Sequence, residues 1–555
     1  MRSRISFFNG AVLRKDLTRF APVWLIFTVG CLLVIPNIVD VHDPGGMLAD
    51  SLSLMNVVNF CYAPICGLLL FGDLFNSRLC NALHAMPLRR EGWFFTHLVS
   101  ALLFCLIPYG VVSVCVLLIL DWNWLMAPVW LLGCTLEFLF YFSVSVLCCL
   151  CTGSRFAAAV FYGLANFLAY IAAWFVEVIY GPLLTGVTVS IRWAEVLTPV
   201  VYLADNCDWL TWTDKITRFQ YGIGDCWTYL LILTALAAAF YFLALVLYKR
   251  RKLEWAGVFV AVRPLAPVFQ VIYTLTMAVI FHLFGSIFVG SNDVGTFFMV
   301  GLAIGWFTGL MLLRRTVRVF RGKAVLGFAV MAAVLLVSFL LTWADPLGIT
   351  RWVPKAEDVQ SIKLEGYGYY YNGVNVTDPT EIADITEIHS QAIRENVDIG
   401  NGNRPVDQQT VKLILNYRLE NGSTVDREYN LDVSTDLAWR LVPYFSDPKV
   451  ILGYDNWEKF LSELYQLRID WNDDLVITGQ DAVSLAQAIR ADCEAGNMVQ
   501  YHEFHYEWGE ETGISANINV DIVVGDRHFD FTIYHDCENT IRWLRDHGAL
   551  PEYLQ

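Results

Sequence analysis

Apolar residues dominate nine stretches of the first 344 residues, and each stretch is long enough to cross a bilayer as one helix. After residue 344 the pattern changes to short alternating runs and amphipathic segments separated by polar turns. The pattern predicts a polytopic α-helical membrane protein with a C-terminal soluble α+β domain. The expected spans are roughly 21–40, 52–72, 97–120, 126–151, 157–178, 227–248, 267–290, 296–313 and 324–343.

Composition and charge support the same division. The chain is 56% hydrophobic and 16% charged, whereas soluble globular proteins are about 45–50% apolar and about 25% charged. These values exclude a secreted soluble enzyme, a disordered chain and a nucleic-acid binder. Residues 1–344 hold 22 Lys and Arg against 16 Asp and Glu, a net charge of +6, while 345–555 hold 16 against 37, a net charge of −21. The acidic part is long enough to bury a core of its own.

The distribution of Lys and Arg predicts the orientation, because cytoplasmic connections carry the excess of these residues. With the N-terminus inside, the outside connections hold only three basic residues, all in one long loop: Arg192, Lys215 and Arg218. Nine spans then place the acidic domain outside the cell, whereas eight or ten would place it in the cytoplasm. The first span follows Arg14, Lys15 and Arg19 and lacks a small-residue cleavage site, so we expect it to be retained.

Four of the fourteen cysteines fall in the segments expected outside. Cys207 and Cys226 share one connection, and Cys493 and Cys537 share the C-terminal domain. An even number in each exposed segment suits two disulfides, and four unpaired thiols are the alternative. Cys148, Cys149 and Cys151 resemble a metal cluster but end an apolar helix with no histidine nearby, which favours packing over ligation.

Motifs of catalysis and ATP binding are absent from the sequence. The only Gly-Lys pair, Gly322-Lys323, is followed by Ala324 and lacks the upstream glycine of a P-loop. No H-E-x-x-H, G-x-S-x-G or paired C-x-x-C motif occurs. We therefore expect a chain that is not itself an enzyme and holds no cofactor.

Two segments on the expected inner side have helical amphipathic patterns. Residues 7–20 alternate apolar and basic faces, as an interfacial helix does. Residues 76–91 combine apolar positions at helical spacing with a proline and a basic end, a pattern suited to a short helix that docks on a partner. An ordinary basic loop is the alternative for both. The candidate contact residues in the second segment are Leu83, His84, Met86, Pro87, Arg89 and Arg90.

These segments carry a resemblance to a known family. A basic amphipathic helix, two spans and the element Leu-His-Ala-Met-Pro-Leu-Arg-Arg-Glu before the third span resemble ABC-2-type transporter permeases. The exit from the sixth span, Tyr-Lys-Arg-Arg-Lys-Leu-Glu-Trp-Ala-Gly, is similar to Gram-positive bacterial members with extra spans and a C-terminal extracytoplasmic domain.

The resemblance implies a domain organisation and a set of partners. It divides the chain into an amphipathic cytoplasmic helix (1–20), a six-span permease core (21–248), three additional spans (249–344) and an extracytoplasmic domain (345–555). It also implies a bacterial plasma-membrane location, a separate cytosolic ABC ATPase that binds ATP and Mg, and a second permease copy or a paralogue. The segment containing Pro87 would contact the ATPase.

Glu137 is the most informative polar residue inside an expected span. An acid at membrane depth is costly unless it is paired or hydrated, so it is a candidate for a substrate pathway. A carboxyl group hydrogen-bonded to a neighbouring helix is the alternative. Hydrogen bonds between helices are also the expected role of Asn56, Asn59, Asn166 and His282.

The C-terminal domain is expected to contain two tandem repeats, about 359–455 and 460–555. Each has a helix, a hairpin and a closing helix: a helix from 377 to 395, a hairpin turned at Asn421-Gly422 and a helix from 434 to 444 form the first. A helix from 478 to 493, a hairpin turned at Gly525-Asp526 and a helix from 538 to 547 form the second. Matching positions lie 102 to 104 residues apart, which favours duplication over a generic α+β domain.

The sequence therefore predicts the membrane-spanning permease subunit of an ABC exporter with an unidentified substrate. The alternative is a peptide-sensing or immunity protein that signals through an ATPase partner with little transport. A stand-alone membrane scaffold is a third interpretation.

Overall fold

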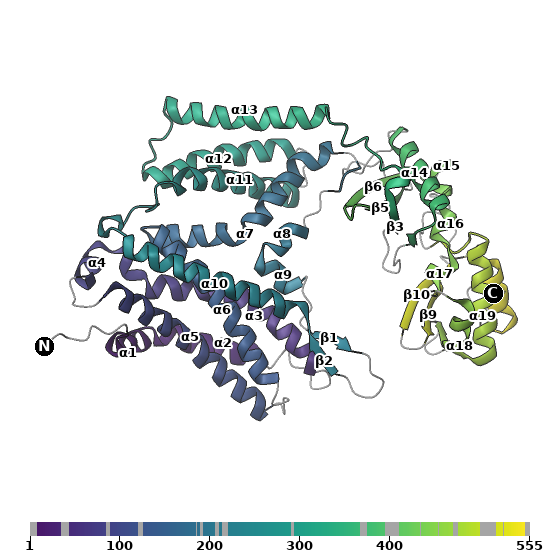
Figure 1. Ribbon diagram of the computed structural model, residues 1–555, viewed down its shortest axis with the longest axis horizontal. Coiled ribbons are helices and arrows are strands. Elements are labelled where there is room, and N and C mark those ends of the chain that lie inside the picture. Colours follow the sequence, from purple (N-terminus) through teal and green to yellow (C-terminus); the bar gives the residue numbers. More distant parts are fainter. Residues whose placement is uncertain are drawn as a thin grey trace. The chain divides into compact units, whose positions relative to one another are not determined.

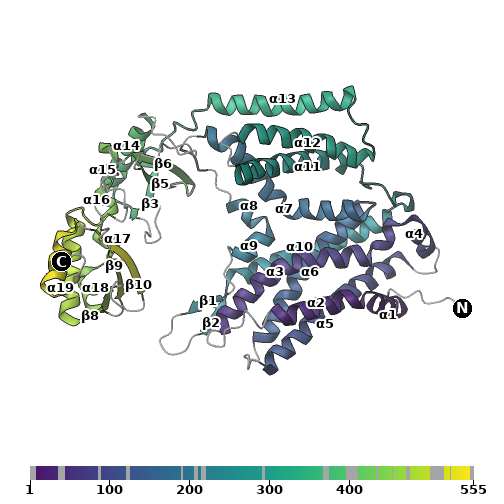
Figure 2. The same ribbon diagram turned by 180° about the vertical axis from the view of Figure 1, so that it is seen from behind.

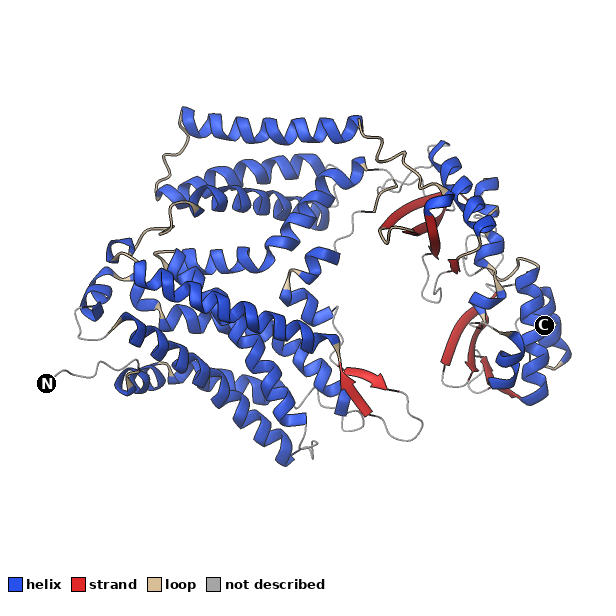
Figure 3. Cartoon of the chain, in the orientation of Figure 1, coloured by secondary structure: helices blue, strands red, loops and turns tan. Residues whose placement is uncertain are grey.

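The computed structural model describes most of the chain in two compact units. The helical unit comprises Met1–Val178 and Ser190–Leu335, and the sheet unit comprises Ile179–Val189 and Leu336–Gln555. Figure 3 shows helices throughout the helical unit and most strands in the sheet unit. The described residues are 8–34, 44–84, 89–119, 126–184, 186–188, 192–205, 210–213, 220–289, 294–366, 374–394, 410–432, 435–452, 454, 456–469, 475–499, 518–524, 527–534 and 536–549.

Eight described helices are long and apolar enough to cross a membrane, which makes the chain a multi-pass helical membrane protein (Figure 1). A further pair, α1 (Gly10–Arg19) and α2 (Ala21–Val34), passes the same test only together and bends by 58° between its members. The expected count of nine spans holds if this bent pair is one span. The eight are α3 (Pro44–Leu70), α5 (Arg90–Ile119), α6 (Met126–Cys151), α7 (Arg155–Tyr180), α10 (Asp225–Arg250), α11 (Leu265–Phe284), α12 (Val294–Arg314) and α13 (Gly322–Ala344).

Small residues set the closest helix contacts. Helices α11 and α12 lie side by side in both views (Figures 1 and 2), with Gly301, Gly305 and Gly309 of α12 against α11. A Cβ atom on Gly305 would lie 2.9 Å from the carbonyl oxygen of Thr274 and 2.7 Å from Cβ of Met277. Glycines four residues apart let two helix backbones approach this closely. The three glycines of α12 therefore form a packing contact with α11 of the same chain.

Helix α13 is covered least. Only 6% of the most apolar 18-residue stretch of this helix is buried within the protein. Near its start, Trp306 Nε1 donates to the carbonyl of Ala324 at 3.0 Å. A helix with apolar residues on all sides suits lipid rather than water. Its exposed apolar residues include Val325, Leu326, Val330, Val334, Leu336 and Val337.

The long connection between α7 and α10 contains short elements. They are η3 (Gly181–Leu183), α8 (Arg192–Val196), α9 (Pro199–Asp205) and the hairpin of β1 (Leu210–Thr213) and β2 (Gln220–Ile223). Helix α9 packs on α3, where Asn56 Nδ2 donates to the carbonyl of Val200 at 2.8 Å. The described helices of this connection before β1 are therefore short, and α9 packs beside a span.

The sheet unit contains two four-stranded antiparallel sheets. The first has the order β4-β3-β5-β6, and its elements follow the chain order β3 (Val359–Gly366), β4 (Val374–Val376), α14 (Pro379–Arg394), β5 (Thr410–Leu419) and β6 (Thr424–Asp432). The second has the order β8-β7-β9-β10, with β7 (Leu464–Ile469), β8 (Leu475–Thr478), α19 (Gly479–Glu494), β9 (Ile518–Val524) and β10 (Arg527–Ile533). Element order and strand order are the same in both. Each sheet has its own buried apolar core.

Both predicted hairpins are present, and so are the helices that precede them. Gly422 has φ +82° at the first turn, which favours glycine, whereas the turn residues 525 and 526 lie outside the described residues. The prediction of a single helix over 434–444 is wrong. Two short helices, α15 (Asp436–Trp439) and α16 (Val442–Phe445), occupy this stretch because Pro443 cannot continue the hydrogen-bond ladder of the first. The closing helix of the second half is α20 (Glu538–Asp546).

Candidate functional site

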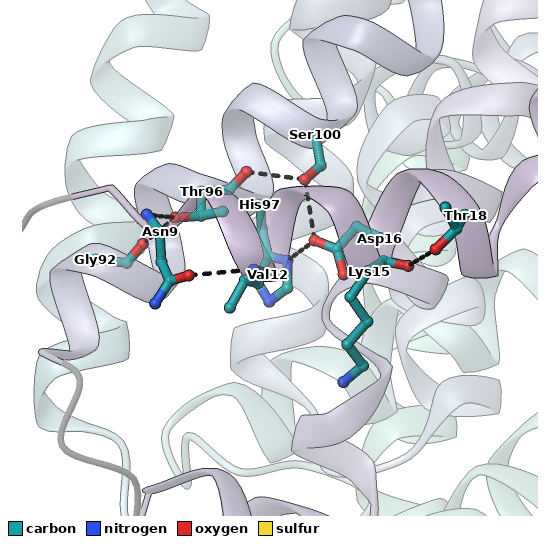
Figure 4. Close-up of polar contacts among 9 residues, drawn as sticks. All are labelled: Asn9, Val12, Lys15, Asp16, Thr18, Gly92, Thr96, His97 and Ser100. Atoms are coloured by element: carbon teal, nitrogen blue, oxygen red, sulfur yellow. Dashed lines mark hydrogen bonds and ion pairs between the residues drawn. The ribbon is translucent and has the colours of Figure 1, made fainter.

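Helix α1 is tied to the N-terminal part of α5 by side-chain hydrogen bonds (Figure 4). Asp16 is buried, and its Oδ2 accepts from Ser100 Oγ at 3.0 Å and lies 2.9 Å from His97 Nδ1. The backbone N–H of Asn9 donates to Thr96 Oγ1 at 3.2 Å, while the Asn9 side chain caps the first turn of α1. These contacts fix α1 along α5.

The outer face of α1 carries the basic residues expected from its sequence. Arg14, Lys15 and Arg19 are exposed, whereas Val12 and Asp16 face the protein. A helix with this division suits the interface between lipid and water, so this interfacial position stays a prediction. The 58° bend to α2 is consistent with that position.

Helix α4 (Ser77–His84) is a short element, and the burial of its first five residues is described. Cys80 is buried, while Ser77, Arg78, Leu79 and Asn81 are exposed. Leu79 is 44% exposed, so the exposed face of α4 combines an apolar side chain with the basic side chain of Arg78. Leu83 and His84 form the last turn of this helix, and Met86 and Pro87 lie outside the described residues.

Arg90 contacts the end of another helix, and its predicted contact with a partner stays a prediction. Its Nη1 donates to the carbonyls of Lys249 at 2.9 Å and Arg251 at 3.1 Å, at the C-terminus of α10. Cations stabilise this end of a helix, where carbonyls lack partners. Glu91 adds an ion pair to Lys249 at 3.1 Å. Arg89 is exposed.

Arg251 is a buried cation that the sequence did not single out. Its guanidinium donates to the carbonyls of Leu150 at 2.6 Å, Thr152 at 2.8 Å and Cys149 at 3.0 Å, and so caps the C-terminus of α6. In the run Lys249 to Lys252 the other three side chains are exposed. The sequence from 249 to 252 does not distinguish Arg251 from its neighbours, because only the fold brings the C-terminus of α6 to its side chain.

A cavity lies at this end of the helical unit. Its lining includes Asp73, Cys80, Trp93, His97 and Tyr248. The cavity therefore adjoins both the buried residue of α4, Cys80, and the α5 residue that contacts α1, His97. The indole N–H of Trp93 is buried without a partner among the described residues. The cavity therefore offers a polar donor to a small molecule such as water.

Glu137 lies in the interior of the helical unit. The residue has no exposed surface, and its Oε2 accepts from Asn59 Nδ2 at 2.9 Å. The predicted hydrogen bonds between helices are thus present for Asn59 and, through Val200, for Asn56. Asn166 instead bonds Tyr162 of its own helix.

The cysteines divide between one disulfide and free thiols. Cys226 is disulfide-bonded, and Cys207, its expected partner, lies outside the described residues. Cys493 and Cys537, predicted as a possible disulfide, are free and buried, and burial raises the pKa of both thiols. Among the described residues no group of three or more His, Cys, Asp or Glu is placed to hold a metal ion.

A buried histidine of α14 contacts two strands of the first sheet. The two ring nitrogens of His389 lie 2.8 Å from the hydroxyls of Tyr417 and Tyr429, one on each side. Burial, with a smaller contribution from Arg427, lowers the pKa of His389 to about 3. The imidazole is therefore neutral at pH 7 and links α14 to β5 and β6.

The segment after α7 docks on this sheet. Gly186 accepts a hydrogen bond from the backbone N–H of Glu428 at 3.2 Å, and Val187 forms an antiparallel bridge with Arg427. Gly186 has φ +75°, and a Cβ there would lie 2.6 Å from the Tyr429 hydroxyl. Only glycine fits, so residues 186–187 form a clasp on β6.

Comparison with protein-family models, with curated proteins and with solved structures finds no match to this chain. The resemblance to ABC-2-type permeases therefore stays a prediction from short motifs. The arguments about function rest on the geometry of the two units.

Proposed function

We propose that this chain is the membrane-spanning permease subunit of an ABC transporter of the ABC-2 type, with ATP hydrolysed by a separate cytosolic subunit. The observation that carries the proposal is α4, a short helix between two spans with a buried anchor at Cys80 and an exposed face at Arg78 and Leu79. Such a face suits a groove on a partner protein. Arg89 lies close along the chain and is exposed beside it.

The proposed orientation has the N-terminus and α4 in the cytoplasm. Basic residues support it: those at the ends of the spans facing α4 are largely exposed, as cytoplasmic Lys and Arg are. The clasp supports the placement of the C-terminal domain, because four spans separate Val187 from Arg427 and an even number returns the chain to the same side. The disulfide at Cys226, at the start of α10, fits an oxidising extracytoplasmic side.

In this proposal the partner's movement enters through α4. Cys80 lines the cavity together with residues of α5 and α10, so displacement of α4 would press on both spans. Helix α1 is fixed to α5 by Asp16 and would move with it. Closing of two ATPases below would in this way change the packing of the spans in an exporter with two permease chains.

The C-terminal domain is proposed to be an internal duplication. The supporting observation is that β3, β4, α14, β5 and β6 have the same chain order and sheet order as β7, β8, α19, β9 and β10. The two halves retain the spacing of about 100 residues noted in the sequence. A duplicated domain would offer two related surfaces for a ligand.

A single substitution tests the partner contact. Leu79→Asp places a charge on the exposed face of α4 without disturbing the Cys80 anchor. We expect it to abolish co-purification of a P-loop ATPase with the tagged chain in mild detergent. Leu347→Asp is the matched control, because this leucine is 82% exposed in the segment after α13. A wild-type chain that purifies without an ATPase, or equal recovery with both variants, would remove the proposal.

The alternative of a sensing or immunity protein is favoured by one observation, the clasp. Because residues 186–187 follow α7 directly, a ligand on the first sheet would act on a span. ATPase activity stimulated by a cationic peptide, without peptide movement across proteoliposomes, would favour this function. Peptide movement with each round of hydrolysis would favour export.

A further inference from the structure

The contact between α3 and α6 is held by two polar pairs one helical turn apart. In the first, Tyr141 Oη donates to Asn56 Oδ1 at 2.6 Å. In the second, Asn59 Nδ2 donates to Glu137 Oε2 at 2.9 Å and to the carbonyl of Cys134 at 3.2 Å. We call this contact the α3–α6 seam.

The second pair has a fixed direction of donation. The Asn59 amide nitrogen faces Glu137 because it also donates to the carbonyl of Cys134, which can only accept, and Tyr109 of α5 then donates its hydroxyl to Asn59 Oδ1. Glu137, Asn59 and Tyr109 have no exposed surface. The Asn59 amide is therefore a neutral donor that the Cys134 carbonyl and the Tyr109 hydroxyl hold in place, and it is aimed at a buried carboxyl group.

The surroundings of Glu137 do not balance a negative charge. Its Oε1 has no hydrogen-bond partner among the described residues, and no Lys or Arg there forms an ion pair with it. Buried carboxylates normally have a cation or several donors, because an unpaired charge in a dry interior costs several kcal/mol or more.

The titratable groups around Glu137 cannot supply the missing positive charge. They are side chains that are neutral when protonated and become negative when they lose a proton, and they come from each helix packed on this part of α6. They are Tyr62 of α3, Tyr109 of α5, Tyr241 of α10, and Cys134 and Tyr141 of α6 itself.

We propose that Glu137 is a proton-binding site within the α3–α6 seam. While the seam is packed, the carboxyl group holds a proton, with Oε2 accepting from Asn59. A proton suits the site because it needs no cavity and removes the charge. When the seam separates, water reaches the group, its O–H bond breaks, the proton passes to water, and a hydrated carboxylate remains.

The site differs from a substrate pathway in its packing. A substrate would need exposed lining, and the polar groups of both pairs on the seam are buried. Gly67 of α3 lies so close to α6 that a Cβ there would be 2.1 Å from Ser145 Oγ. The seam can therefore be opened by a side chain at Gly67.

Infrared spectroscopy tests whether Glu137 holds a proton while the seam is packed. The sample is the purified full chain in lipid nanodiscs at neutral pH, without an ATPase. We expect a carbonyl stretching band of a protonated carboxylic acid that Glu137→Gln removes. Glu177→Gln is the control, because Glu177 is exposed near the end of α7. Absence of the band from the wild-type chain, or its persistence in Glu137→Gln, would overturn the proposal.

A wedge in the seam tests proton release. Gly67→Leu should force α3 from α6, admit water and remove the band while Glu137 is still present. Gly110→Leu is the control, because open space surrounds Gly110 in α5. Variants are compared only as monodisperse peaks in size-exclusion chromatography, and Gly67→Ala replaces Gly67→Leu if the latter aggregates. A band that survives the wedge would overturn the link between hydration and release. Both measurements are independent of the proposed transport function.

Discussion

Replacing Arg251 is the most direct test of how the helical unit is held together at the α4 end. Its guanidinium is the donor for three buried carbonyls at the C-terminus of α6. Methionine at this position keeps much of the side-chain volume but removes every donor. Lysine keeps the charge but offers a compact ammonium in place of a planar fork.

The expected loss follows from these contacts. The three distances lie between 2.6 and 3.0 Å, and the residues that supply the carbonyls are buried. A hydrogen bond to a charged group contributes about 1.5–3 kcal/mol, but contributions within one group are not additive. We therefore expect Arg251→Met to cost about 3–5 kcal/mol, because it leaves three buried carbonyls without this donor at about 1–3 kcal/mol each and the three costs do not add in full. Arg251→Lys should fall between the wild type and Arg251→Met.

The measurement is the apparent melting temperature of the detergent-purified chain, followed by size-exclusion chromatography after heating. A loss of this size corresponds to roughly 5–20 °C for a unit of this kind. Arg250→Met is the control, since Arg250 is adjacent and exposed. If Arg251→Met and Arg250→Met melt at the same temperature, the assignment of Arg251 as the cap of α6 is refuted.

Three further predictions follow from the structure. Above about pH 6.5 the folded and unfolded states both hold neutral His389. As the pH falls from about 6.5 to 3, only the unfolded state binds a proton, so the urea-unfolding free energy of the sheet unit should decrease by about 1.4 kcal/mol for each pH unit. His389→Gln should reduce this slope, and an unchanged slope would contradict the lowered pKa of His389. Gly305→Leu should separate α11 from α12 and lower the melting temperature, because its Cβ has no room, while Gly295→Leu, with open space, should not; equal melting would contradict the close contact. Cys226→Ser removes one cysteine of a disulfide and should leave its partner cysteine as a free thiol. Mass spectrometry after alkylation without reductant should therefore detect one more alkylated cysteine than in the wild type. An unchanged count would argue against the disulfide.

At the α4 end, the sequence does not show which of two adjacent basic residues contacts the end of a helix. Arg90 looks like Arg89 in the sequence, yet it donates to the end of α10, while Arg89 is exposed. Among the four basic residues from 249 to 252 only Arg251 is buried. The charge pattern predicts on which side of the membrane such residues lie, but not which of them meets a helix end.

In the C-terminal domain, the sequence predicts most elements correctly. Its hairpins and the helices before them were predictable from alternation and turn residues, including Gly422 with its positive φ. The strands β3 and β7, which complete the sheets, were not predicted. They pair with strands far along the chain, Ile362 with Tyr417 and Leu467 with Ile522, and their short apolar runs carry no turn signal of their own.

The sequence by itself determined which helices of this protein are long and apolar enough to cross a membrane, because length and apolar content are local properties of the chain. It also marked Glu137 as costly at membrane depth. Only the tertiary structure decided that Asn59 and Tyr109 surround this acid without a cation, that Arg251 caps α6, and that residues 186–187 clasp β6. Each of these contacts joins residues between 50 and 240 positions apart, and their pairing depends on how helices and strands pack rather than on any local pattern.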